Sequence, residues 1–371
     1  MMTNNLHGSI NERVNDKLST RFQNNDRKRP RSGNYGWRLP IRRLLKTGAL
    51  ISVLAMVAVV SACGGQKSGL VEGKTNVVTS FYPIYFLAKE IGGDKANVVN
   101  LVPAGVEPHD WTPKSRDLQT AGDAELFLYN GAGLEGWVAD FVQGLPKDGK
   151  TVTGEVSKGI KLLTAEEEEA AALEVGEGEA HGEEAHNHEE EHHDEHGEGI
   201  DPHTWVSPKS ALVMAGNVRD YLVSVDAANK SVYDANYEKL AAKLTEIDQS
   251  YIEELGKMPN KAIVVSHQAF GYLCRDYGLK QVAIMGLSPD AEPRAQDLLN
   301  IAKFVKDNGV KTIFFEELVS AELADTLARE ANVGTLVLNP LEGLTPEQDK
   351  DGTDYISLME TNLKHLKQAL Q

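Results

Sequence analysis

Short apolar segments alternate with amphipathic stretches in the first half of the chain. Strand-like runs fall at 76–80, 97–102 and 124–130, and helical patterns fall at 82–91, 114–121 and 135–144. This alternation is typical of a parallel sheet with helices on its faces. We therefore predict an α/β lobe in this part of the chain.

The second half repeats the same pattern. Strand-like runs fall at 262–266, 280–286, 311–317 and 334–340, and helical patterns fall at 293–308, 320–331 and 354–370. The predicted fold class is therefore α/β with two lobes, each a parallel-type sheet flanked by helices.

Two helical stretches separate these halves. The first runs from Pro208 to about Ser224, and the second begins near Asp226, a candidate N-cap, and ends at Gly256. Its apolar residues recur every three or four positions, at Tyr233, Tyr237, Leu240, Leu244, Ile247 and Tyr251. Some thirty residues at about 1.5 Å each reach about 45 Å, enough to cross the molecule. We predict one long, rigid linker helix between the lobes.

The N-terminus has the pattern of an export signal. Basic residues precede an apolar run at 49–60, which Ser61-Ala62-Cys63-Gly64 follows. The run is short for a membrane span, and VVSAC resembles a bacterial lipobox. We predict a lipid on Cys63 that anchors the chain to the bacterial cell membrane, outside the cytoplasm. An uncleaved anchor helix is the alternative.

These patterns predict five parts of the chain: 1–62, leader and lipoprotein signal peptide; 63–75, lipid-anchored tether; 76–225, N-terminal α/β lobe; 226–257, linker helix; and 258–371, C-terminal α/β lobe. An insertion at 164–200 in the first lobe is rich in Glu, Gly, Ala and His. It holds fifteen acidic residues and no Lys or Arg. Such a segment cannot bury enough apolar surface to fold, so we predict disorder there.

Charge and cysteine content narrow the function further. The formal net charge is −17, and residues 1–62 carry +8, which leaves −25 on the rest. An acidic chain without a basic patch is a poor nucleic-acid binder and a reasonable cation binder. With Cys63 lipidated, Cys274 has no partner for an intramolecular disulfide. Cys274 is predicted to be a small core residue, with a thiolate ligand as the alternative.

Five histidines lie outside the insertion: His7, His109, His203, His267 and His365. His7 falls in the leader, and His365 is predicted to be solvated on the terminal helix. His109 and His267 follow predicted strands, where open α/β sheets bind ligands, and His203 precedes a helix. The segments PHDW and PHTW, around His109 and His203, are similar to one another. Imidazole is a standard zinc ligand, so these three histidines are candidate metal ligands, with plain hydrogen bonding as the alternative.

A tetrahedral zinc site needs a fourth ligand. Glu342 follows the strand at 334–340 and is the best candidate. Glu316 and Glu317 occupy an equivalent strand end, and residue chemistry alone barely separates the three. A structural salt bridge is the alternative role for whichever does not bind.

Two enzyme classes fit the sequence less well than a binding protein does. Gly131–Gly136 satisfies GxGxxG, with Glu155 about twenty residues on, but it follows the third predicted strand. The glycines are better explained by a tight turn and close packing. A zinc hydrolase is disfavoured because four protein ligands would exclude a catalytic water. We predict that the protein is not an enzyme.

Seven segments together resemble one family: SFYPIYFLAKEIGGD, GVEPHDWTP, NGAGLEGW, DPHTWVSP, SHQAFGYL, FFEE and LNPLEGL. From about residue 76 to 371 the chain resembles the zinc-type solute-binding lipoproteins of metal-ion ABC importers. The resemblance implies that His109, His203 and His267 bind the metal and that Glu342, or a water, completes the site. Manganese-type relatives carry a carboxylate in place of His267, whereas three nitrogens and one carboxylate suit Zn²⁺.

The resemblance also implies a function. The chain would capture Zn²⁺ with high affinity between its lobes and deliver it to an ABC permease with its ATPase, as a monomer. Some zinc-type relatives have a disulfide in the second lobe, which this chain cannot form. The insertion would be a secondary, low-affinity zinc collector, because its ligands must be ordered on binding; a solvated acidic spacer is the alternative. Its candidate ligands are His181, His186, His188, His192, His193 and His196.

Overall fold

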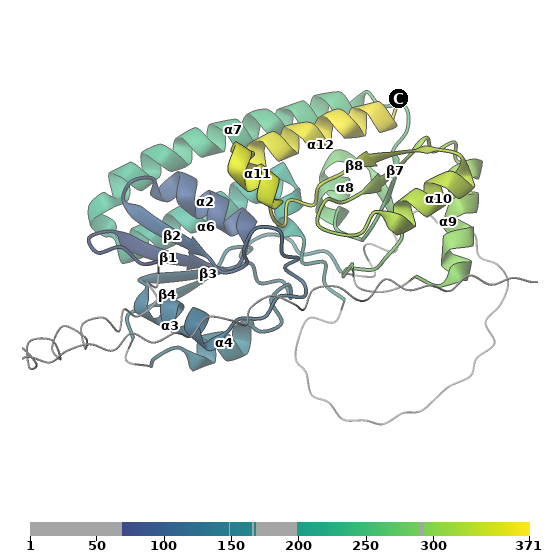
Figure 1. Ribbon diagram of the computed structural model, residues 1–371. Helices are drawn as coiled ribbons and strands as arrows, with labels where there is room; N and C mark the ends of the chain where they lie inside the picture. The colour runs from purple at the N-terminus through teal and green to yellow at the C-terminus, as the bar shows by residue number, and fades with distance from the viewer. Residues whose placement is uncertain (1–68, 148, 165–166, 168–198, 290–292) are drawn as a thin grey trace, which may run out of the picture. The chain divides into compact units, whose positions relative to one another are not determined.

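A computed structural model describes residues 69–147, 149–164, 167, 199–289 and 293–371 (Figure 1). These residues belong to one compact unit, Gly65–Gln371. Cys63, His7 and the six histidines of the insertion lie outside the described residues.

The first sheet contains four parallel strands in the order β2-β1-β3-β4. The strands are β1 (Thr75–Thr79), β2 (Ala96–Asn100), β3 (Leu126–Tyr129) and β4 (Val152–Glu155). All five residues of β1 are buried, as expected for a central strand that is covered on both faces. The sheet and its helices form what we call the N-terminal lobe.

Side chains alternate between the two faces of this sheet. Val77 packs with helices α2 (Tyr82–Gly92) and α6 (Pro208–Val225), whereas its neighbour Val78 packs on the opposite face. That opposite face is covered by α3 (Ser115–Asp123) and α4 (Val138–Gly144). Figure 1 shows these two helix layers on either side of the strands.

The second sheet repeats the arrangement, with four parallel strands in the order β6-β5-β7-β8. Its elements are β5 (Ala262–Val265), α8 (Gly271–Tyr277), β6 (Lys280–Ala283), α9 (Ala295–Asp307), β7 (Thr312–Phe315), α10 (Glu322–Ala331), β8 (Gly334–Val337), α11 (Pro346–Asp351) and α12 (Tyr355–Ala369). Helices α9 and α10 pack on one face through Val264 and Ile313. Ile263 and Val265 join the core of α8 and α12 on the other face. This half is the C-terminal lobe, and the predicted two-lobed α/β class is confirmed.

Helix α7 (Lys230–Gly256) runs along both lobes, as Figure 1 shows. It contacts α2 and α6 of the N-terminal lobe and α8 and α12 of the C-terminal lobe. Its 27 residues span about 40 Å. Four of the residues on its predicted inner face, Tyr233, Leu240, Leu244 and Tyr251, are at most 2% exposed.

The predicted N-cap at Asp226 is wrong. A short 3-10 turn, η2 (Ala227–Asn229), precedes α7, and Asp226 makes no side-chain cap bond. Its Oδ2 instead accepts hydrogen bonds from Thr75 Oγ1 at 2.9 Å and from Tyr233 OH at 2.6 Å. The carboxylate therefore ties the start of β1 to α7.

Several buried hydrogen bonds join the two lobes. Trp205, in the 3-10 turn η1 (Thr204–Val206), donates from Nε1 to Pro340 O at 2.8 Å, and Tyr355 OH donates to Trp205 O. Tyr272 OH donates to Asp201 O at 2.7 Å. One hydrophobic cluster also contains residues of both lobes. No helix in the described ranges is long and apolar enough to cross a membrane.

Candidate metal centre

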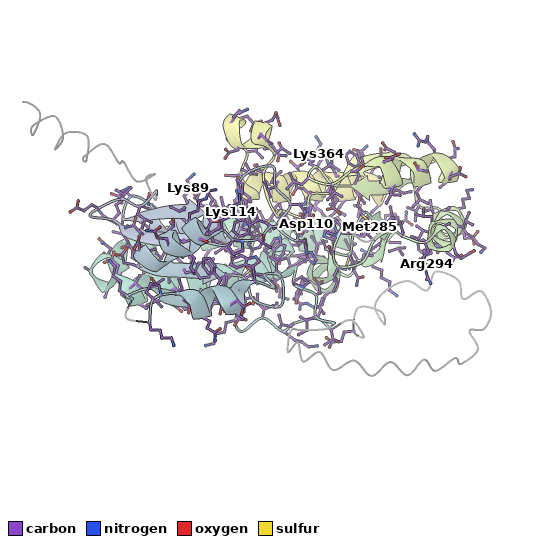
Figure 2. The ribbon with its side chains drawn as sticks, turned by 60° about the horizontal axis from the view of Figure 1, so that its bottom comes forward. Lys89, Asp110, Lys114, Met285, Arg294 and Lys364 are labelled. Carbon is purple, nitrogen blue, oxygen red and sulfur yellow. The ribbon has the colours of Figure 1, made fainter. Side chains whose placement is uncertain are left out.

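The candidate ligands come from four loops. His109 lies beyond β2, His203 stands at the start of η1, His267 follows β5 and Glu342 follows β8. Because the carboxyl ends of parallel strands collect at one edge of each sheet, these loops face the junction between the lobes. Figure 2 labels Asp110, the neighbour of His109, near this junction.

The four side chains converge on one point. Their candidate ligand atoms all lie within 4.8 Å of one another. His203 Nε2 is 3.2 Å from His109 Nε2 and 3.3 Å from His267 Nε2. Glu342 Oε1 is 3.5, 3.4 and 3.5 Å from Nε2 of His109, His203 and His267. An ion with tetrahedral bonds of about 2.0–2.1 Å has ligand atoms about 3.3 Å apart, so these five distances match that geometry.

The four clustered side chains are almost entirely buried, although they can carry charge. His203 and His267 are fully buried, Glu342 is 1% exposed, and the side chain of His109 is 10% exposed. Neither carboxylate oxygen of Glu342 accepts a hydrogen bond within the described residues. A buried carboxylate without such bonds is costly unless a positive charge lies beside it. The arrangement therefore favours a bound cation.

Two further carboxylates orient the histidine rings. Asp201 Oδ1 accepts from Nδ1 of His203 at 2.7 Å, and Glu316 Oε1 accepts from Nδ1 of His267 at 2.8 Å. Since a carboxylate only accepts, Nδ1 carries a proton, and Nε2 is directed at the cluster, where the neutral ring would present its lone pair to a metal. Such partners fix the tautomer of metal-binding histidines and raise their basicity.

The pKa values of His203 and Glu342 reflect the charged groups around them. Burial alone would lower the pKa of His203, but Asp201 and Glu342 outweigh burial and raise it to about 9. Burial alone would raise the pKa of Glu342, yet the three histidines hold it well below its ordinary value. Both shifts show that positive charge is stabilised between these side chains.

Asp201 and Glu107 are polar groups beside the cluster that the sequence patterns did not predict. Each stands two residues before a candidate ligand, and each accepts from that histidine's backbone N–H: Glu107 Oε1 from His109 at 3.1 Å and Asp201 Oδ1 from His203 at 2.8 Å. Burial and the neighbouring Glu342 raise the pKa of Glu107 to about 8. The signal was available, because both segments read acidic residue-Pro-His.

Other predicted residues lie elsewhere. His365 was expected to be solvated, but it is half-buried, and its Nδ1 is 2.7 Å from Val337 O, so that expectation is wrong. Cys274 is 7% exposed and lies in the core rather than among the four clustered side chains. Glu317 accepts from Asn339 Nδ2 at 2.7 Å and from Gln348 Nε2 at 2.8 Å. Glu316 and Glu317 therefore hold other side chains.

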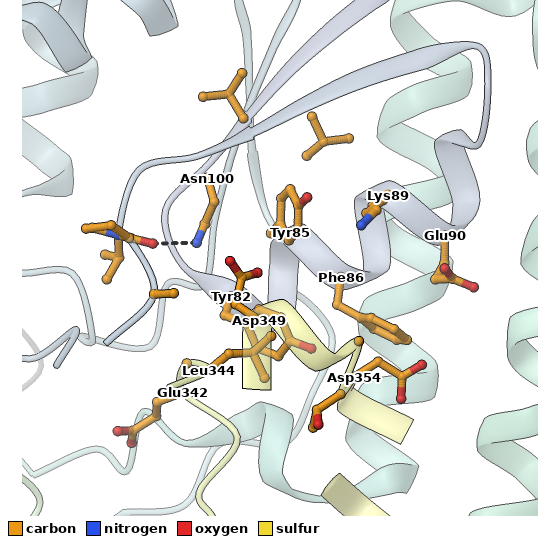
Figure 3. Close-up of a pocket in the computed structure, with 18 residues that line it drawn as sticks. Tyr82, Tyr85, Phe86, Lys89, Glu90, Asn100, Glu342, Leu344, Asp349 and Asp354 are labelled. Atoms are coloured by element: carbon orange, nitrogen blue, oxygen red, sulfur yellow. Dashed lines mark hydrogen bonds between the residues drawn. The ribbon is translucent and has the colours of Figure 1, made fainter. Parts of the chain in front are cut away.

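A cavity of about 550 Å³ lies beside the Glu342 loop (Figure 3). It is lined by Tyr82, Tyr85 and Phe86 from α2 and by Asp349 of α11, among others. In Figure 3 the carboxylate of Glu342 points away from these residues. Glu342 also lines this cavity, whereas none of the three candidate histidines does.

The fold and the cluster define a class: a two-lobed α/β protein with a candidate metal centre where the lobes meet. The family model of ZnuA, zinc-uptake complex component A periplasmic, matches residues 77–369. This chain belongs to that family, and the resemblance found in its motifs is confirmed.

Related sequences and a solved structure support the same family assignment. The zinc-binding lipoprotein AdcA of Streptococcus pneumoniae R6 is 42% identical over 324 residues, 87% of this chain. The high-affinity zinc uptake system protein ZnuA of Bacillus subtilis 168 is 40% identical over 329 residues, 88% of this chain and 98% of that protein. The crystal structure of the Zn(II)-bound ZnuA-like domain of S. pneumoniae AdcA superimposes with a TM-score of 0.66 at 39% identity, covering 80% of this chain and 99% of that domain. The chain spans 61% of the length of the AdcA protein that it matches.

Proposed function

We propose that this chain is the extracytoplasmic zinc-binding component of an ABC importer. It captures Zn²⁺ with His109, His203, His267 and Glu342 and delivers the ion to a membrane permease that works with an ATPase. The observation that carries the proposal is the convergence of three imidazole nitrogens and one carboxylate oxygen at tetrahedral spacing. The zinc-related names of its relatives support the choice of ion.

Zinc is favoured over manganese by the ligand chemistry. Zn²⁺ suits nitrogen-rich tetrahedral sites, whereas Mn²⁺ prefers oxygen-rich surroundings with more ligands. Four protein ligands also leave no open position for a reacting water, so the site is suited to binding and release rather than to turnover.

The remaining parts of the proposal concern the rest of the chain. Residues 1–62 would be removed, Cys63 would carry the lipid, and 63–75 would tether a monomer to the outer face of the cell membrane. The lipoprotein name of AdcA supports this localisation. We place the lobe boundaries at 76–225 and 258–371, on either side of a linker at 226–257. The insertion at 164–200 would collect further zinc weakly.

Metal analysis tests the proposal directly. Protein purified without chelators should carry about one tightly held zinc and little manganese, and apo protein should bind Zn²⁺ far more tightly than Mn²⁺ in a competition titration. A tight site for Mn²⁺, or no tight site at all, contradicts it.

A further inference from the structure

The loop after β3 holds the backbone on both sides of His203. Asn130 is fully buried. Its Nδ2 donates to Pro202 O at 2.9 Å, and its Oδ1 accepts from Thr204 Oγ1 at 3.0 Å. The side-chain amide of Asn130 is therefore hydrogen-bonded to the residue before His203 and to the residue after it.

Asn130 is itself held by a buried carboxylate. Its backbone N–H donates to Glu135 Oε1 at 2.8 Å, and the N–H of Gly131 donates to Glu135 Oε2 at 3.2 Å. Ser80 Oγ, just beyond β1, donates to Oε1 at 2.7 Å. Glu135 is 6% exposed, and burial raises the pKa of its carboxyl despite these bonds. The carboxylate thus joins the ends of β1 and β3 beneath Asn130.

The glycines at 131–136 allow this turn. Gly131 has φ +82°, and a Cβ there would lie 2.6 Å from Glu155. Gly133 also has a positive φ, of +89°. The chain can therefore reverse directly after Asn130 and bring Glu135 back to its backbone N–H. This is a use for the GxGxxG-like segment that involves no nucleotide.

We propose that Asn130 is a positioning residue that sets the location of His203 in the metal centre, an inference that rests on the proposed zinc function. Asp201 fixes the orientation of the His203 ring, whereas Asn130 fixes the backbone that carries it. Removing an outer partner of a metal ligand typically weakens metal binding by about 10- to 100-fold.

Substitution of Asn130 tests this role against a matched control. Asn130→Ala should weaken zinc binding about 10-fold in a chelator-competition titration. Thr204→Val, which removes the Oγ1 hydrogen bonds to Asn130 Oδ1 and Met214 Sδ, should weaken zinc binding about three-fold. The control is Asn76→Ala at the start of β1, because Asn76 is 8% exposed and its Nδ2 donates to Val71 O and Lys74 O. The control should lower Tm while binding zinc within about two-fold of the parent, since distant sites act independently.

Two spectroscopic measurements separate positioning from general stability. In the Co²⁺-loaded protein, the visible d–d bands should change in Asn130→Ala and remain unchanged in Asn76→Ala. In the metal-free protein, the imidazole ¹⁵N resonances of His203 should move in Asn130→Ala and remain unchanged in Asn76→Ala.

The results that would overturn the positioning role differ from the result that would overturn the proposed zinc function. Unchanged zinc affinity and unchanged His203 resonances in Asn130→Ala overturn the positioning role, as does an equal loss of affinity in Asn76→Ala. A parent protein that binds no zinc overturns the proposed function instead, while the metal-free resonances still decide whether Asn130 positions His203.

Discussion

At the scale of single residues, the candidate centre is defined by charge as much as by geometry. Glu342 brings a negative charge into a fully buried position where neither of its oxygens accepts a hydrogen bond among the described residues. Asp201 and Glu316 bring two more beside the histidines. The excess of negative charge makes a dication the natural occupant.

Each candidate histidine should be needed for tight binding. Substituting His109, His203 or His267 by Ala removes one of four ligands, so the zinc dissociation constant should rise by at least about 100-fold, beyond the usual effect of an outer partner. Calorimetry with a competing chelator measures this change. His365→Ala is the control, because His365 contacts the backbone of β8 and lies outside the cluster. A variant that keeps tight binding removes its residue from the ligand set.

His109 and His267 could be proposed as candidate ligands from the sequence because each follows a strand, where open α/β sheets bind ligands. His203 precedes a helix instead, and the likeness of PHTW to PHDW singled it out. Glu342 could not be separated from Glu316 and Glu317 in that way, since all three follow strands. The difference is one of side-chain direction: Glu342 reaches Nε2 of the histidines, whereas Glu316 reaches Nδ1 of His267. Sequence periodicity does not encode such distances.

At the scale of elements, strand β4 is one that the sequence pattern did not predict. Gly154 is the one buried residue of VTGE, and Val152 is 40% exposed, as suits an edge strand with few apolar residues. Gly154 is required because a Cβ would lie 2.8 Å from the Tyr221 ring. By contrast, the inner face of α7 was predictable, because a 27-residue helix repeats its apolar spacing many times.

Asp226 should make stability depend on pH at the junction of β1 and α7. Burial alone would raise its pKa, but hydrogen bonds from Tyr233, Asn229 and Thr75 outweigh burial and lower it. A carboxyl whose pKa is lower in the folded state stabilises the fold above its unfolded pKa of about 3.9. That contribution is lost as pH falls through the folded pKa.

We therefore expect Asp226→Asn to lower the free energy of unfolding by about 1–2 kcal/mol at pH 7. The gap between parent and variant should shrink below about pH 4 in urea titrations. A gap that is the same at pH 3 and pH 7 contradicts the role of the charged carboxylate.

At the scale of the whole molecule, the lobes are joined firmly. Helix α7 contacts both lobes, and Trp205 bonds to Pro340 and Tyr355 of the C-terminal lobe. Opening the lobes would exchange these bonds for bonds to water and would expose the hydrophobic cluster that both lobes share, which costs free energy.

Zinc loading should consequently change the relative positions of the lobes only slightly. Small-angle scattering of apo and zinc-loaded protein lacking residues 1–62 should give radii of gyration that agree within about 1 Å. A larger compaction would mean that α7 bends or that the lobes separate without metal.

The insertion should be separable from the tight centre. Deleting residues 166–198 removes the six additional histidines, so the zinc stoichiometry should fall while the tightest dissociation constant stays nearly unchanged. Equilibrium dialysis and competition titration measure the two quantities. Loss of the tight site after the deletion would show that the insertion supplies a ligand to it.

The residues that flank this insertion are fixed in place. Thr164 and Ile200 form an antiparallel bridge, and Asp201 N donates to Leu163 O at 3.0 Å. Tyr272 OH accepts from the N–H of Leu163 at 3.2 Å and donates to Asp201 O at 2.7 Å. Residues 164 and 200 therefore lie side by side, so the length of chain between them can change without moving either flank. A fluorescent domain with neighbouring termini could be spliced in there, which would turn the protein into a tagged reporter without moving His203.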